Sequence, residues 1–189
     1  MPLPQHARYS YADLLDWPDA ERYELYDGFI RALASPSIPH QAISGEIFRQ
    51  IANFLKGKPC KVYSAPVDVR LFETADDTPA DVDTVVIPDL FVVCDHSKID
   101  RRGIKGAPDL VIEILSDSSR RYDRHTKLWL YEAAGVREYW VIDPDRQTVQ
   151  VYTLHDGKYR TGDTYTATAS LPVGILPGCV IDLQAVFEA

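Results

Sequence analysis

The segment Pro108–Leu115, which reads PDLVIEIL, constrains the fold more than any other part of the chain. Alternate residues of a strand point to opposite faces of a sheet, so Ile112 and Ile114 share one face and Glu113 lies on the other. Both faces are largely apolar, which is typical of a strand covered on both sides. The sequence therefore predicts a central strand with a packed layer on each face.

Glu113 is the exception in this apolar strand. Burying an ionised carboxylate costs several kcal/mol unless the group is paired with a cation or bound to a metal ion. One interpretation is a structural ion pair with an arginine, and the other is a metal ligand or catalytic acid. The strand by itself favours neither interpretation.

A second acid for the same metal ion must come from a neighbouring strand. Asp109 and Glu113 would lie about 13 Å apart along one strand. Magnesium binds its oxygen ligands at about 2.0–2.1 Å, so one ion cannot bind both acids. Asp89 begins the segment DLFVV, and adjacent strands lie about 4.8 Å apart. Asp89 and Glu113 can therefore bind one cation, whereas Asp109 is expected to stabilise the start of its strand or the preceding loop.

Lys127 interrupts the apolar stripe of a helix predicted over residues 121–134 and ended by Gly135. Leu130 and Tyr131 follow it at helical spacing, so Lys127 occupies a position that should face inward. Its stem could pack beside the core while the ammonium reaches water. Alternatively, the ammonium points at the site, where it could stabilise phosphate charge or orient a hydrolytic water.

Glu24 and His40 are two further candidates, and each also has a structural interpretation. Glu24 lies in a strand of a hairpin that turns at Asp27-Gly28, so its side chain faces either solvent or the site. His40 lies in the first turn of a long amphipathic helix that begins after Ser37. A neutral imidazole is unexceptional at that position.

The rest of the pattern indicates one mixed α+β domain over residues 1–189, with no repeat and no linker. A short helix is expected at Tyr11–Asp16, and strands are expected from Cys60 onward. Pro88 points to an edge strand or to the start of a strand rather than to a central strand. A further hairpin is expected around Pro144-Asp145.

The composition excludes several classes of protein. No apolar run approaches the roughly 18–20 residues that span a bilayer. The net charge of −8 argues against a protein that coats nucleic acid non-specifically. P-loop, zinc-protease and serine-hydrolase motifs are absent from the sequence. The three scattered cysteines, Cys60, Cys94 and Cys179, predict reduced thiols and a cytoplasmic setting.

Several motifs in a fixed order resemble the Uma family of putative restriction endonucleases, and the resemblance covers most of the chain. They are YELYDG at Tyr23–Gly28, His40, PDL at Pro88–Leu90, PDLVIEILSDSS at Pro108–Ser119, Asp123, Lys127 and GVREYWVIDP at Gly135–Pro144. Each piece is weak alone, but their combination is highly specific.

The resemblance implies the PD-(D/E)XK nuclease-like fold, a mixed sheet flanked by helices. It also implies that Asp89 and Glu113 are metal ligands and that Glu24 contributes to the metal site. The superfamily carries a lysine two residues after the glutamate, where this chain has Leu115. The Uma family takes that lysine from the following helix, which corresponds to Lys127.

The leading hypothesis is an endonuclease that hydrolyses DNA phosphodiester bonds with Mg²⁺, or alternatively Mn²⁺. The residues expected to bind the nucleic acid are Arg120, Arg121, Arg124 and His40. A homodimer is expected because cutting both strands favours two active sites. The alternatives are a non-catalytic member of the fold that binds nucleic acid or protein, and a metal-dependent hydrolase acting on another substrate.

Overall fold

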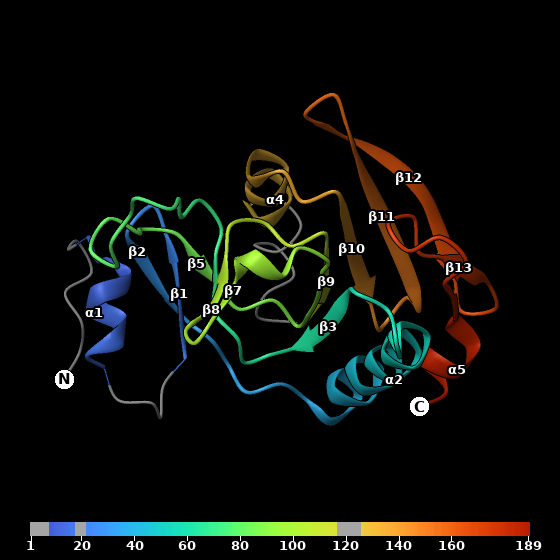
Figure 1. Ribbon diagram of the computed structural model, residues 1–189. Coiled ribbons are helices and arrows are strands. Elements are labelled where there is room, and N and C mark those ends of the chain that lie inside the picture. Colours follow the sequence, from blue (N-terminus) through green and yellow to red (C-terminus); the bar gives the residue numbers. More distant parts are fainter. Residues whose placement is uncertain (1–7, 18–21, 117–125) are drawn as a thin grey trace.

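The computed structural model describes residues 8–17, 22–116 and 126–189, which form two mixed sheets, a small terminal hairpin and flanking helices (Figure 1). The central sheet has the order β12-β11-β10-β9-β6-β3. Its strands are β12 (Lys158–Thr166), β11 (Thr148–His155), β10 (Glu138–Asp143), β9 (Leu110–Ile114), β6 (Leu90–Val93) and β3 (Lys61–Ser64). The mixed α+β fold predicted from the sequence is confirmed.

β9 lies in the interior of the central sheet, as its sequence predicted. It pairs with β10 in parallel and with β6 antiparallel. Every residue of β9 is buried. A parallel pair needs a crossover connection, and α4 (Leu128–Ala134) lies between β9 and β10 in the chain. Gly135 ends α4 in the left-handed conformation, as expected of a C-terminal cap.

One face of the central sheet is covered by α2 (Ile38–Leu55) and α5 (Leu183–Phe187), which lie together in Figure 1. The Ser37 hydroxyl accepts a hydrogen bond of 3.4 Å from the His40 backbone N–H and so caps α2. Ile47 and Ile51 of α2 are fully buried against this face, together with Ile112 of β9. The hairpin of β13 (Ser170–Pro172) and β14 (Val180–Asp182) completes this layer.

The other face is covered by α4 and by a second sheet, which we call the N-terminal sheet. Its order is β2-β1-β5-β4-β8-β7. Its strands are β1 (Tyr23–Tyr26), β2 (Phe29–Ala32), β4 (Val69–Arg70), β5 (Val85–Val86), β7 (Ile99–Asp100) and β8 (Gly103–Lys105). Val111 and Leu115 pack on this side. Glu113 shares their face of β9 and therefore points between the two sheets.

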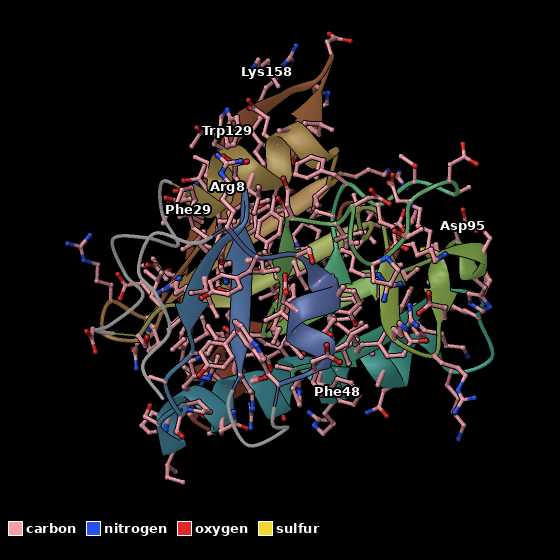
Figure 2. All side chains as sticks on the ribbon, turned by 90° about the vertical axis from the view of Figure 1, so that its left-hand side faces the viewer. Arg8, Phe29, Phe48, Asp95, Trp129 and Lys158 are labelled. Atoms are coloured by element: carbon pink, nitrogen blue, oxygen red, sulfur yellow. A yellow bond between two sulfur atoms is a disulfide. The ribbon has the colours of Figure 1, made fainter. Side chains whose placement is uncertain are left out.

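The β1–β2 hairpin turns at the two residues that the sequence indicated. Asp27 has φ 48° and Gly28 has φ 76°, and two positive values are required for a type I′ turn. Figure 2 shows Phe29 at the outer edge of the N-terminal sheet, beside Arg8, whose guanidinium carbon lies 5.3 Å from the ring centre. The hairpin thus forms one end of the sheet.

The segment around Pro88 connects the two sheets. β5 ends at Val86 in the N-terminal sheet, and β6 begins at Leu90 inside the central sheet. Pro88 lies two residues before β6, so its position near a strand start is confirmed. The strand that follows is an inner strand, with β9 on one side and β3 on the other, and not the edge strand that was the other alternative. This crossing places Asp89 at the junction of the two sheets.

The prediction of three reduced thiols was wrong for two of them. Cys60 precedes β3 and Cys94 follows β6, and the register pairs Lys61 with Val93. The two cysteines are therefore neighbours across the strands, and they form a disulfide. Cys179 is free and buried. Because stable disulfides are rare in cytosolic proteins, the cysteines no longer support a cytoplasmic setting. Among the described helices, none is long and apolar enough to cross a membrane.

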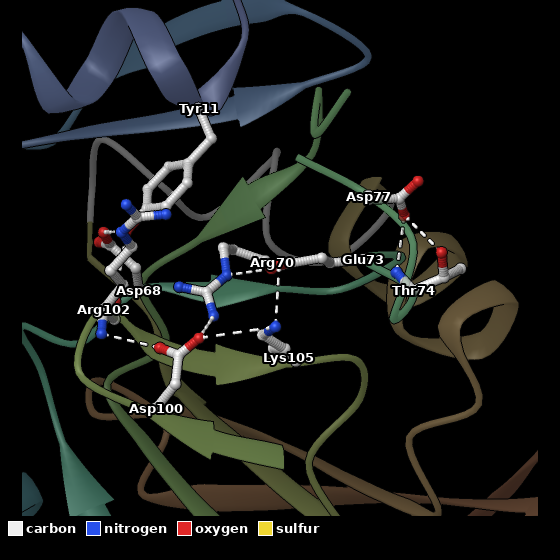
Figure 3. Close-up of polar contacts among 9 residues, drawn as sticks. All are labelled: Tyr11, Asp68, Arg70, Glu73, Thr74, Asp77, Asp100, Arg102 and Lys105. Atoms are coloured by element: carbon white, nitrogen blue, oxygen red, sulfur yellow. Dashed lines mark hydrogen bonds and ion pairs between the residues drawn. The ribbon is translucent and has the colours of Figure 1, made fainter. Parts of the chain in front are cut away.

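A buried ionic cluster joins the edge of the N-terminal sheet to the loop after β4 (Figure 3). Arg70, 1% exposed, donates through Nε to Glu73 and through Nη2 to Asp100 Oδ2 at 2.7 Å. Lys105 Nζ lies 3.6 Å from Glu73 and 3.9 Å from Asp100. The Tyr11 ring of α1 (Tyr11–Leu15) is 5.3 Å from the guanidinium carbon. Arg70 therefore connects three elements of the N-terminal sheet region.

We expect Arg70→Met to lower the free energy of unfolding by about 1–3 kcal/mol, because it leaves two carboxylates without their main hydrogen-bond donor. Lys105 stays close enough to offset part of their charge, which limits the loss. Urea unfolding measures the effect. Lys105→Met is the matched control, because its side chain is 39% exposed, and it should cost less than about 1 kcal/mol. Equal midpoints for Arg70→Met and the unmodified protein would contradict this role.

Candidate active site

The antiparallel register of β6 and β9 brings Asp89 beside Glu113. Leu90 pairs with Ile112, so the next pair in the same register is Asp89 and Glu113. The Ile114 backbone N–H donates to Asp89 Oδ2 at 2.8 Å and fixes that carboxylate against β9. Oδ1 of Asp89 accepts no hydrogen bond from the residues that the structure describes, and the side chain is 21% exposed.

Two side chains of the helical segment that follows β9 in the chain donate hydrogen bonds to Glu113. Its Oε1 accepts from Lys127 Nζ at 2.8 Å and from the Tyr131 hydroxyl at 2.6 Å. Burial, followed by the charge of Glu113, raises the pKa of Tyr131 well above its usual value, so this hydroxyl stays a donor. The sequence left open whether Glu113 forms a structural ion pair or has a role in the site. The structure shows an ion pair, and its cation is a lysine and not the expected arginine. The same carboxylate also lines a cavity.

Lys127 lies between two carboxylates. Its Nζ is 2.8 Å from Glu113 Oε1 and 3.1 Å from Glu24 Oε1. The alternative in which its ammonium reaches water is wrong, because the side chain is 4% exposed. Burial alone would lower the pKa of Lys127, but the charges of Glu113 and Glu24 raise it well above its usual value.

This raised pKa has two consequences. Lys127 keeps its proton at neutral pH, so it is a cation between the two carboxylates. Its stabilising contribution is fully present below the unfolded-state pKa of about 10.5 and is lost only as the pH rises through the higher folded-state value.

Glu24 faces the protein interior and is fully buried. Its Oε1 accepts from the Ile87 backbone N–H at 3.0 Å, and its Oε2 accepts from the Tyr26 hydroxyl. Arg31, directly opposite Glu24 in the β1–β2 register, lies 3.8 Å from Oε2. Glu24 thus contacts Lys127 from the N-terminal sheet, and it is not among the described residues that line the cavity.

The cavity has a volume of about 430 Å³ and lies where the two sheets and α2 meet. Asp89, Glu113 and Lys127 line it. His40, in the first turn of α2, lines it too and places its Nε2 3.2 Å from Asp89 Oδ2. Arg31 lines a further part of its wall. The cavity therefore combines two carboxylates with several basic side chains.

The structure brings together four of the residues singled out in the sequence, namely Asp89, Glu113, Lys127 and Glu24, and places His40 beside them. Asp109 lies apart and accepts from the Cys94 backbone N–H at 2.8 Å, as expected for a residue that fixes a strand end. The predicted nucleic-acid contacts Arg120, Arg121 and Arg124 lie outside the described residues.

Two residues of the site were missed from the sequence. Tyr131 was counted as part of an apolar stripe, although its position four residues after Lys127 placed both on one helix face. Arg31 gave no distinctive signal, because nothing in the sequence shows that β2 borders the cavity.

The donor set fits a magnesium or manganese ion. Within residues 8–17, 22–116 and 126–189, no three His, Cys, Asp or Glu side chains converge as metal ligands. Mg²⁺ typically uses only one or two carboxylates, with water and substrate phosphate as its other ligands. Asp89 and Glu113 could supply such a pair, since both line the cavity and Asp89 has an oxygen without a hydrogen bond from the described residues.

Comparison with known proteins identifies a family and a shared fold. The Uma2 family model, described as "Putative restriction endonuclease", matches residues 11–184. An uncharacterized protein, slr1290, of Synechocystis sp. (strain ATCC 27184 / PCC 6803 / Kazusa) is 26% identical over 158 residues, which cover 82% of this chain and 79% of that protein. The crystal structure of a putative nuclease belonging to DUF820 from Anabaena variabilis ATCC 29413 superposes with a TM-score of 0.72 at 23% identity. The match covers 95% of this chain and 97% of that chain, so the fold is shared.

Proposed function

Because this chain belongs to the Uma2 family of putative restriction endonucleases, we propose that it is a metal-dependent endonuclease that hydrolyses DNA phosphodiester bonds. The observation that carries the proposal is a pair of carboxylates beside a buried lysine in one cavity, with Asp89 directly before β6 and Glu113 on the neighbouring β9. A structural ion pair needs one carboxylate and no cavity, whereas this arrangement has two carboxylates that face a space large enough for a ligand.

Asp89 and Glu113 would hold the cation, and a divalent ion there lowers the pKa of a bound water and stabilises charge on the phosphate. The Ile114 backbone N–H and His40 orient Asp89. Lys127 and Tyr131 bind one oxygen of Glu113 and thereby fix the direction of the carboxylate.

Lys127 would supply positive charge beside the reacting phosphate, with its position set by Glu113 and Glu24. It can orient the attacking water through a hydrogen bond. In this arrangement Glu24 contributes to the metal site through Lys127. A homodimer remains part of the proposal, since cleavage of both strands favours two such sites.

Removal of divalent metal is expected to stop the reaction. Supercoiled plasmid should be nicked or linearised with Mg²⁺ or Mn²⁺ and stay intact with EDTA, and calorimetry should detect binding of Mn²⁺ to the protein alone. DNA binding without metal binding would select a non-catalytic member of the fold. Metal binding without cleavage of DNA would select a hydrolase with another substrate.

A further inference from the structure

The β1–β2 hairpin brings two arginines to the cavity that holds Asp89 and Glu113. Arg31 is directly opposite Glu24 in the antiparallel register, so the two side chains lie on the same face of the hairpin. Arg22 lies at the open end of the hairpin, where its carbonyl oxygen accepts a hydrogen bond of 2.9 Å from the Leu33 backbone N–H. Both arginines line the cavity. The hairpin therefore adds two arginines to the wall of the candidate active site.

These arginines are more exposed to solvent than Lys127. Lys127 contacts Glu113 and Glu24 at 2.8 and 3.1 Å and is almost completely buried. Arg31 lies 3.8 Å from Glu24, beyond hydrogen-bond distance, and its side chain is 23% exposed. Arg22 is exposed. A guanidinium carries five N–H donors in a planar fork, so it can bind a phosphate while it keeps a carboxylate neighbour.

The remaining wall of the cavity suits the uncharged part of a nucleotide. Ala32 at the end of β2 and Ala34 in the segment that leads to α2 contribute small side chains, and Pro66 contributes another apolar surface. The volume of about 430 Å³ falls within the range of about 300–1,000 Å³ that is usual for sites that enclose small organic ligands. The cavity therefore has room for a sugar or base next to a bound phosphate.

We propose that Arg31 and Arg22 form a subsite for a backbone phosphate of the nucleic acid, next to the bond that Asp89 and Glu113 would expose to hydrolysis. The substrate class of this subsite rests on the proposed nuclease function, but the subsite itself binds without metal or cleavage. Guanidinium groups match phosphate oxygens in a bidentate geometry that an ammonium cannot reproduce. The two arginines thus position the nucleic-acid strand, whereas Asp89 and Glu113 act in the hydrolysis itself.

Binding in EDTA tests the subsite separately from cleavage. The full chain is titrated against a fluorescein-labelled DNA duplex at several NaCl concentrations, and the dissociation constant is read from fluorescence anisotropy. Each phosphate contact contributes about 0.9 to the slope of log Kd against log salt. Arg31→Gln should therefore lower that slope by about 0.9, and the double variant Arg22→Gln/Arg31→Gln by about 1.8. Arg31→Lys should keep the slope, because it keeps the charge.

Arg49→Gln is the matched control, since Arg49 lies on α2, pairs with Glu46 and is 58% exposed. Its slope should equal that of the unmodified protein. An unchanged slope in the double variant, an equal fall for Arg49→Gln, or no DNA binding at all would overturn the subsite. If Arg31→Gln melts earlier in thermal unfolding, the slope of the folded Arg22→Gln variant decides, and it should be lower by about 0.9. A lowered slope without metal-dependent cleavage would keep the subsite and remove the nuclease proposal.

Discussion

Glu113→Gln is expected to lower Mg²⁺-dependent DNA cleavage by more than about 100-fold, because groups that only support a metal ligand already contribute about 10–100-fold. Glutamine keeps the size of the side chain and removes its negative charge. The cation would then have Asp89 as its one remaining carboxylate from this pair. Plasmid cleavage rates under single-turnover conditions measure the loss, and calorimetry with Mn²⁺ should show weaker metal binding in the same variant.

The fold should tolerate this substitution. Lys127 lies between two carboxylates in the unmodified protein, and in the variant it still pairs with Glu24 at 3.1 Å. The amide oxygen that Glu113→Gln introduces can accept the hydrogen bonds that Lys127 and Tyr131 donate. Thermal unfolding should therefore change little, which separates a catalytic loss from a loss of structure.

Glu46→Gln is the matched control, because it makes the same chemical change on the surface of α2, where Glu46 pairs with Arg49. Its cleavage rate should equal that of the unmodified protein. If Glu113→Gln cleaves as fast as Glu46→Gln, then Glu113 is not a metal ligand, and its contact with Lys127 is purely structural.

Lys127→Met is expected to lower the free energy of unfolding by about 3–5 kcal/mol, as for other buried ion pairs that lose one partner. Glu24 and Glu113 are both almost completely buried, and the substitution leaves them close together without the cation between them. Urea unfolding at neutral pH measures the loss.

Lys158→Met is a sharp control for this effect. Lys158 also lies 2.8 Å from a glutamate, Glu132, but its side chain is 79% exposed. A surface pair of this kind contributes about 0–1 kcal/mol, so the same chemical change should cost little. Adding Glu24→Gln to Lys127→Met should restore part of the lost stability. Equal losses for Lys127→Met and Lys158→Met would show that burial of the three charges is not what makes Lys127 essential to the fold.

Local pattern was sufficient for the main elements. The apolar run of β9, the turn at Asp27-Gly28 and the glycine cap at Gly135 each depend on residues close in sequence, and all three are confirmed. The sequence around Pro88 predicted that a strand begins there, but not that β5 and β6 belong to different sheets. Proline marks where a strand begins, but which sheet a strand joins depends on partners far along the chain.

Long-range contacts account for what the sequence missed. Cys60 and Cys94 are 34 residues apart, and their bond depends on the β3–β6 register. The place of Arg31 at the cavity wall depends on how the N-terminal sheet packs on the central one. Neither arrangement leaves a local pattern, because both arise between segments that meet only in the folded chain.

Glu113 shows the same division within the site. The sequence by itself determined that this carboxylate is buried, because alternation within one strand decides which face a side chain occupies, and that Asp89 could lie beside it. Only the tertiary structure decided which side chains contact this carboxylate. They are Lys127, directly before α4, and Tyr131 of α4, and Lys127 also contacts Glu24. The physical reason is that burial follows from short-range periodicity, whereas charge compensation depends on which distant segments pack together.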